Sequence, residues 1–68
     1  MTIIINGAQR EIVGQETISL PDLIKSLEIG EHPLLVELNR EALLTREFDH
    51  QQINDGDELE IIRMVAGG

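Results

Sequence analysis

The stretch NDGDELEIIRM, residues 54–64, decides the fold of this chain. It opens with a dense turn signal and continues as a strand predicted over residues 58–64. Leu59 and Ile61 share one face, while acidic residues and Ile62 share the other, so the strand offers one face to a core. No proline interrupts the run, which permits a place inside a sheet.

A β-hairpin is predicted at the N-terminus. The β-branched run at residues 2–5 stops at Asn6 and Gly7, a dipeptide that suits a two-residue turn because both positions accept positive φ. The return strand is expected over residues 8–13, closed by Gly14.

One amphipathic helix follows the hairpin. Ser19 and Asp22 have the spacing of a capping box, which predicts a helix that starts at Leu20. Gly30 fits the position just past the helix end, so the helix should be about ten residues long. Apolar side chains recur at helical spacing at Leu20, Leu23, Ile24 and Leu27.

The second half of the chain reads as strand, turn, short strand and helical turn. Residues 34–38 alternate at period two, and residues 39–41 can turn the chain into a short strand over residues 42–44. Thr45 should cap a single helical turn in which Phe48 seals one end of the core.

This order of elements gives one helix to a whole sheet. If the hairpin and helix form a right-handed crossover, the first strand, with Ile3 and Ile5 inward, pairs in parallel with the last strand at the sheet centre. We therefore predict an α+β fold of the β-grasp (ubiquitin-like) type. It forms one domain over residues 1–68, with a mixed sheet of four to five strands, one main helix on one face and a flexible C-terminal tail at residues 65–68.

A single helix leaves the opposite face of the sheet bare. The apolar side chains expected there are Ile4, Leu35, Ile62 and Met64. On so small and acidic a domain they suggest a surface that docks a partner. Scattered exposed aliphatic residues are the plain alternative.

Composition excludes several classes of function. Thirteen acidic against five basic residues give a net charge of −8, which argues against nucleic acid and favours a basic protein partner. The chain has no cysteine, and His32 and His50 lack ligands at metal spacing, so we expect no metal site and no bound cofactor. No signal peptide or membrane span is apparent, which makes the cytoplasm the expected location.

The last four residues are Val65, Ala66, Gly67 and Gly68. Two terminal glycines after an apolar strand place the α-carboxylate on a thin tether without side chains. Four extended residues reach roughly 13 Å, enough to carry the terminus into a partner's active site. Chain ends are often small and frayed, so the tail gains meaning only from the fold that precedes it.

The chain resembles the ThiS/MoaD family of ubiquitin-like sulfur carriers over essentially its full length. The residues that carry the resemblance are Asn6-Gly7, the helix from Leu20, residues 36–39, Arg46 before the turn with Phe48, residues 55–57 and the final Val65-Ala66-Gly67-Gly68. Arg63-Met64 stands where molybdopterin-type carriers commonly place two prolines, which favours the thiamin-type, ThiS-like branch.

The resemblance implies a carrier acted on by other enzymes, and not an enzyme itself. An adenylating (ThiF-like) enzyme would use ATP to adenylate the carboxylate of Gly68, and a persulfide sulfur donor would convert it to a thiocarboxylate. A thiazole synthase (ThiG-like) would then take the sulfur for thiamin thiazole formation. The alternatives are a carrier for molybdopterin or another pathway, a ubiquitin-like protein modifier joined to lysine through Gly68, and a plain interaction domain.

Overall fold

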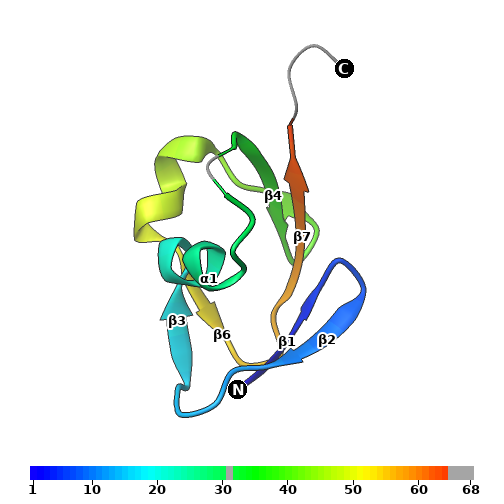
Figure 1. Ribbon diagram of the computed structural model, residues 1–68, viewed down its shortest axis with the longest axis vertical. Helices are drawn as coiled ribbons and strands as arrows, with labels where there is room; N and C mark the ends of the chain where they lie inside the picture. The colour runs from blue at the N-terminus through cyan, green and yellow to red at the C-terminus, as the bar shows by residue number, and fades with distance from the viewer. Residues whose placement is uncertain (31, 65–68) are drawn as a thin grey trace.

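A computed structural model describes residues 1–30 and 32–64 of the chain. In chain order the elements are β1 (Thr2–Ile5), β2 (Ala8–Glu11), β3 (Thr17–Ser19), α1 (Leu20–Ser26), β4 (Leu34–Leu38), β5 (Glu41–Ala42), the 3₁₀ helix η1 (Thr45–His50), β6 (Gln52–Asn54) and β7 (Glu58–Arg63). Figure 1 shows α1 to one side of the main sheet, above β3 and β6, and β7 running upward away from the N-terminus.

The main sheet has five strands in the order β2-β1-β7-β4-β5. β7 is central, parallel to β1 and antiparallel to β4, while the two outer pairs are antiparallel. This mixed sheet with one helix is the β-grasp fold that the sequence predicts. The strand at residues 58–64 is one residue shorter than predicted and occupies the interior place that its apolar content favours.

The core lies between the sheet and α1, and alternation along the strands builds it. Ile3, Val36 and Leu59 are fully buried, as expected from their place in the period-two pattern. The remaining buried side chains are Ile5, Ile18, Leu20, Leu23, Ile53 and Ile61. Phe48 is partly buried against this cluster, so its expected position is confirmed.

The first hairpin forms around the predicted turn. Asn6 and Gly7 have φ values of 52° and 81°, the positive values that a tight two-residue turn requires. β2 ends at Glu11 and not at residue 13, because the chain turns again at Gly14, whose φ is 81°. Val13 is 86% exposed and contributes no packing there.

The start of the helix is as predicted and its end is not. α1 begins at Leu20, and the Ser19 hydroxyl accepts a hydrogen bond from the Asp22 N–H at 3.2 Å. The helix ends at Ser26 because Glu28 already adopts a φ of 55°. The left-handed residue that ends the helix is thus Glu28, two positions before Gly30.

The segment after β4 differs from the prediction in two places. The turn uses only Asn39 and Arg40, with φ values of 50° and 73°, so the next strand is β5 and not residues 42–44. Thr45 is the first residue of η1 and not its cap. Leu44 takes the cap position, and its N–H donates to the Glu47 carboxylate at 2.7 Å.

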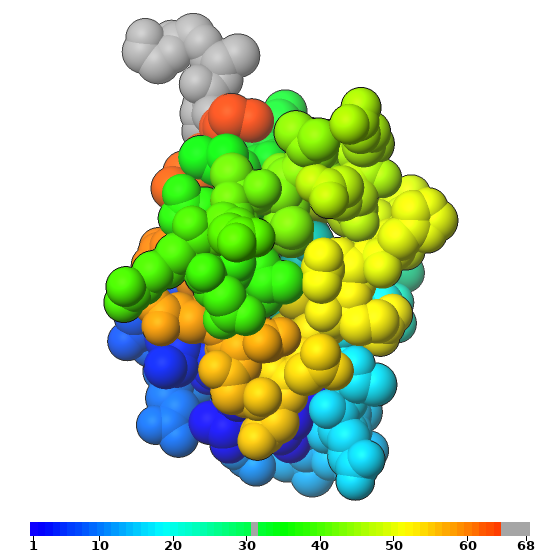
Figure 2. Space-filling model, turned by 180° about the vertical axis from the view of Figure 1, so that it is seen from behind, coloured from blue at the N-terminus to red at the C-terminus, as the bar shows by residue number. Residues whose placement is uncertain are grey.

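A second small sheet, of β3 and β6, was absent from the sequence-based prediction. The two strands are antiparallel and place Ile18 opposite Ile53. Both side chains belong to the core, so this sheet closes the end of the domain below α1 (Figure 1). Seen from behind in Figure 2, residues 34–54, in green and yellow, cover much of the surface.

Candidate functional site

The reactive tail predicted from the sequence, Val65, Ala66, Gly67 and Gly68, lies outside the described residues. The structure does describe the strand that leads into it. β7 ends at Arg63, and Met64 is the last residue described before the tail. The candidate site is therefore built from what holds this end of β7.

On one side, β4 holds β7 to its last residue. Arg63 lies opposite Leu34, and the Met64 N–H donates to the Pro33 carbonyl oxygen at 2.8 Å. The backbone at the start of the tail is thus fixed to the residue that precedes β4.

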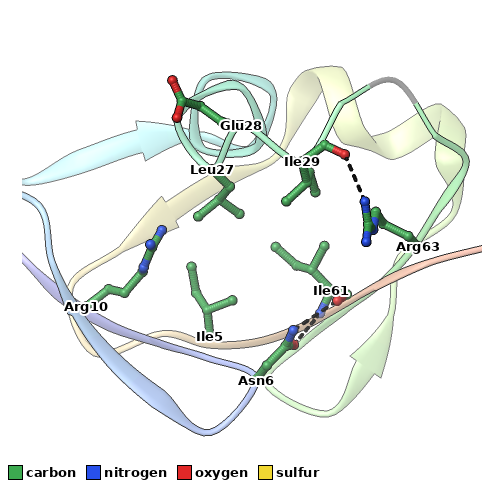
Figure 3. A pocket seen from close by; sticks show the side chains of 8 residues that line it. All are labelled: Ile5, Asn6, Arg10, Leu27, Glu28, Ile29, Ile61 and Arg63. Atoms are coloured by element: carbon green, nitrogen blue, oxygen red, sulfur yellow. Dashed lines mark hydrogen bonds between the residues drawn. The ribbon is translucent and has the colours of Figure 1, made fainter.

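On the other side, β1 ends before β7 does, and a side chain makes the next hydrogen bonds to β7. The last aligned pair is Ile5 with Leu59, so β7 continues beyond the end of β1. The Asn6 amide fills the next position: its Nδ2 donates to the Ile61 carbonyl oxygen at 3.0 Å, and its Oδ1 accepts from the Ile61 N–H at 2.7 Å (Figure 3). A side chain thereby extends the pairing of β1 with β7 by one step.

Among residues 1–30 and 32–64, no side chain takes the corresponding place for the next backbone groups on this side of β7. Because N–H and C=O groups alternate sides along a strand, those of Arg63 point the same way as those of Ile61. Within residues 1–30 and 32–64, no hydrogen bond to the Arg63 N–H or C=O is present. Within the part of the chain that the structure describes, the end of β7 thus has one paired edge and one open edge.

The turn before β7 fixes the beginning of the same strand. The Asp55 carboxylate accepts from the Thr2 N–H at 2.7 Å, and the Gly56 N–H donates to the Thr2 carbonyl oxygen at 2.8 Å. The Asp57 carboxylate accepts from the Asn54 N–H at 2.8 Å and from Asn39 Nδ2 at 3.1 Å. Turn propensity predicted this loop, but its hydrogen bonds to Thr2 of β1 and to Asn39 in the turn after β4 appear only in the structure.

The four residues predicted for a docking face are all exposed. The exposed fraction is 37% for Ile4, 40% for Leu35, and 50% for both Ile62 and Met64. Leu35 lies directly opposite Ile62 on neighbouring strands, at the tail end of β7. Ile4 lies opposite Glu58, four residues earlier along β7.

Acidic side chains separate these two apolar parts. Glu37 and Glu60 lie directly opposite each other on β4 and β7, between Ile4 and the pair of Leu35 and Ile62. Like charges in directly opposite positions destabilise a sheet. The face beside the tail is therefore apolar near Ile62 and acidic at Glu37 and Glu60, farther from the end of β7. This pattern is complementary to a partner surface that has an apolar contact next to basic groups.

Neither a metal centre nor a membrane span is found in the described parts of the chain. In residues 1–30 and 32–64, no group of three or more His, Cys, Asp or Glu side chains could hold a metal ion. No helix within those residues is long and apolar enough to cross a membrane.

Comparison with known families gives one match that covers nearly the whole chain. The model of the ThiS family matches residues 3–68. The match therefore includes β1 from Ile3 onward with its following turn, β7, and Gly68.

Solved structures agree with this match in both sequence and fold. A crystal structure of the thiamine biosynthesis protein ThiS from Geobacter metallireducens is 30% identical, with a TM-score of 0.87 and full coverage of both chains. A solution structure of a thiamine biosynthesis protein from the same organism is 30% identical, with a TM-score of 0.81. It covers all of this chain and 88% of the other.

Two curated relatives are also similar. A thiazole synthase from Paramagnetospirillum magneticum is 31% identical over all 68 residues, and the chain spans only 20% of its length. An uncharacterized protein, ycf40, from Porphyra purpurea is 38% identical over 53 residues, which are 78% of this chain and 75% of that protein.

Proposed function

Because the chain belongs to the ThiS family, we propose that it is a sulfur carrier protein of thiamin biosynthesis. The observation that carries the proposal is the family match over residues 3–68, which runs through the strand β7 to the terminal glycine. The solved relatives named for thiamine biosynthesis support the same pathway.

The proposed chemistry begins at the carboxylate of Gly68. A free carboxylate is a poor acyl donor, because its negative charge repels nucleophiles and an oxide is a poor leaving group. An adenylating, ThiF-like enzyme transfers AMP from ATP to this carboxylate and releases pyrophosphate. The product is a mixed anhydride whose carbonyl carbon is open to attack.

Sulfur then enters from a persulfide donor. Its terminal sulfur attacks the carbonyl carbon and AMP leaves, which gives an acyl persulfide. Attack by a thiol on the inner sulfur of the persulfide forms a disulfide and releases the thiocarboxylate on Gly68. A thiazole synthase, ThiG-like, accepts the sulfur from it, and the thiazole synthase relative that contains a region similar to this chain supports that pairing.

The chain's own contribution is presentation of the terminus. Gly67 and Gly68 add no side chains, so a narrow channel in the adenylating enzyme can close around the backbone. Reaction requires the terminus to come within about 3–3.5 Å of the reacting phosphate. The paired edge of β7 at Arg63 and Met64 gives the tail a fixed point of departure.

The body of the domain docks outside that channel. We assign the docking contact to Ile62, Leu35 and Met64, which lie next to the departure point of the tail, with Ile4 as a more distant contact. In this proposal the chain is a carrier and not an enzyme. ATP belongs to the partner, and the cytoplasm remains the expected location.

Intact mass spectrometry tests the proposal. After incubation with an adenylating enzyme, ATP and a persulfide donor, the chain should gain sulfur in place of one oxygen, and the change should map to Gly68. Branched conjugates to lysine would instead support a protein modifier. An unchanged mass with an active adenylating enzyme would refute both.

A variant at the terminus tests the channel. Gly68→Ala should fold normally and lose ATP–pyrophosphate exchange, because its methyl group must enter the space around the reacting carboxylate. Circular dichroism checks the fold. Exchange at the wild-type rate would contradict a threaded tail.

A further inference from the structure

A groove opens between the end of α1 and the sheet, on the side of the molecule opposite the docking face. Its volume is about 410 Å³. Side chains from β1, β2, β7 and the end of the helix line it: Ile5, Asn6, Arg10, Leu27, Glu28, Ile29, Ile61 and Arg63. Figure 3 shows the aliphatic side chains of this set converging from above and below.

Aliphatic side chains line the groove from both the sheet and the helix. Ile5 and Ile61 rise from the sheet, and Leu27 and Ile29 descend from the end of the helix (Figure 3). Ile5 and Ile61 are only 8% and 7% exposed, so the floor is the rim of the hydrophobic core and is held rigidly. The apolar surface open to a ligand comes mainly from the half-buried Leu27 and Ile29, so a ligand that covers it needs apolar groups of its own.

The charged groups that face the groove are basic. Arg10 and Arg63 extend along opposite sides of it, whereas the Glu28 carboxylate points away (Figure 3). The chain has only five basic residues against thirteen acidic ones, and two of the five are here. Guanidinium groups are pure donors, so a ligand must supply acceptors, and a carboxylate matches the fork of the guanidinium with two parallel bonds.

Most of these donors are free in the described residues. Arg63 makes one long contact, from Nη1 to the Ile29 carbonyl oxygen at 3.5 Å, and no bond from the Arg10 guanidinium is present within residues 1–30 and 32–64. The open backbone edge of Arg63 adds one N–H donor and one C=O acceptor beside the groove. A polypeptide backbone offers the matching pair of groups.

We propose that this groove binds an extended segment of a partner protein in which aliphatic side chains alternate with acidic ones. Aliphatic side chains would cover the floor, carboxylates would pair with Arg10 and Arg63, and the backbone would bond to the free edge of β7. An open groove suits a peptide better than a small molecule, which requires a pocket that encloses most of its surface. The attraction for carboxylates is local to Arg10 and Arg63, because the chain as a whole carries a net charge of −8.

The proposal goes beyond the sulfur-carrier function because it uses a different surface. The docking residues Leu35 and Ile62 point to the face opposite α1, whereas Ile61 and Arg63 point to the helix side of the same strand. The chain could therefore hold one partner by its bare face and another in the groove at the same time.

Titration of the ¹⁵N-labelled full chain with a synthetic probe tests the proposal. The probe is an acetylated and amidated octapeptide that alternates valine and glutamate, and the control probe alternates valine and lysine. Saturable shifts should appear for the amides of residues 5, 10, 27–29, 61 and 63 with the acidic probe only. Equal shifts of these groove amides with both probes, no saturable shift at them, or shifts confined to Leu35 and Ile62 would overturn the proposal.

A charge-reversal variant of Arg10 provides a second test of the proposal. Arg10→Glu should weaken binding of the acidic probe about fivefold or more, the upper end for an exposed ion pair. The matched control is Arg40→Glu, at the turn between β4 and β5, which should change the affinity less than about twofold. Equal weakening by both variants would show only non-specific attraction to net charge and would refute a built groove. The Gly68 mass test is independent of either result.

Discussion

Replacing Asn6 with glycine should remove about 2 kcal/mol from the free energy of unfolding. Glycine keeps the positive φ of the turn but deletes the amide that binds both backbone groups of Ile61, at 3.0 and 2.7 Å. Each half-buried hydrogen bond contributes about 0.5–1.5 kcal/mol, so two contribute about 1–3 kcal/mol. For a domain of this size, that loss lowers Tm by about 8–16 °C.

The assay is urea or thermal unfolding followed by circular dichroism, since the chain has no tryptophan or tyrosine to report by fluorescence. Asn39→Gly is a matched control: Asn39 also has a positive φ and makes two side-chain hydrogen bonds, to Asp57 and Glu58, but both are exposed. It should cost less than about 1 kcal/mol. Hydrogen exchange should show the Ile61 amide losing protection only in the Asn6 variant.

Two outcomes would refute this reasoning. If Asn6→Gly costs no more than Asn39→Gly, the amide does not act as an extension of β1. If the Ile61 amide keeps its protection, another group or water replaces the side chain. Either result would remove the claim that Asn6 steadies the strand leading to the tail.

Three further changes test the fold and the docking face. Ile53→Ala should lower the free energy of unfolding by about 2–5 kcal/mol, because this β6 side chain is fully buried. The control Leu44→Ala, at a 53% exposed position, should change it by less than about 0.5 kcal/mol. Similar urea midpoints for the two variants would contradict the second sheet. Ser19→Ala should cost about 1 kcal/mol through loss of the cap on α1, and an unchanged Tm would argue against that cap. Ile62→Asp should lower the free energy of unfolding by less than about 1 kcal/mol. The same variant should bind the adenylating enzyme more weakly, as measured by isothermal titration calorimetry. Wild-type affinity would exclude Ile62 from the docking face.

Short-range patterns predicted most of the elements. The Asn6-Gly7 turn, the capped start of α1 and the inward faces of the long strands depend on residues within a few positions of one another. Helix and strand periodicity depend on the spacing of neighbouring residues, so the sequence shows these features directly. The same patterns misplaced the end of α1, because nothing nearby in the sequence marks Glu28, a residue with a side chain, as the left-handed position.

For the candidate site, too, the sequence predicted the local features and the structure supplied the long-range ones. The sequence pointed to the glycine tail and to the exposed faces of Ile4, Leu35, Ile62 and Met64, and the structure confirms that exposure. The sequence placed acidic residues on the same face as Ile62, but it did not show that two of them meet between Ile4 and the pair of Leu35 and Ile62. That arrangement depends on the register between β4 and β7, which sets Glu37 against Glu60.

By itself, the sequence determined which residues turn inward and that a single helix must cover a mixed sheet, because alternation and capping are local properties of the chain. Tertiary structure alone decided that residues 17–19 pair with residues 52–54, and that the Asn6 side chain completes a strand 55 positions away. It also decided that Arg10 and Arg63 share one groove. Each of these contacts joins segments far apart in the chain, and only closure of the whole sheet fixes their register.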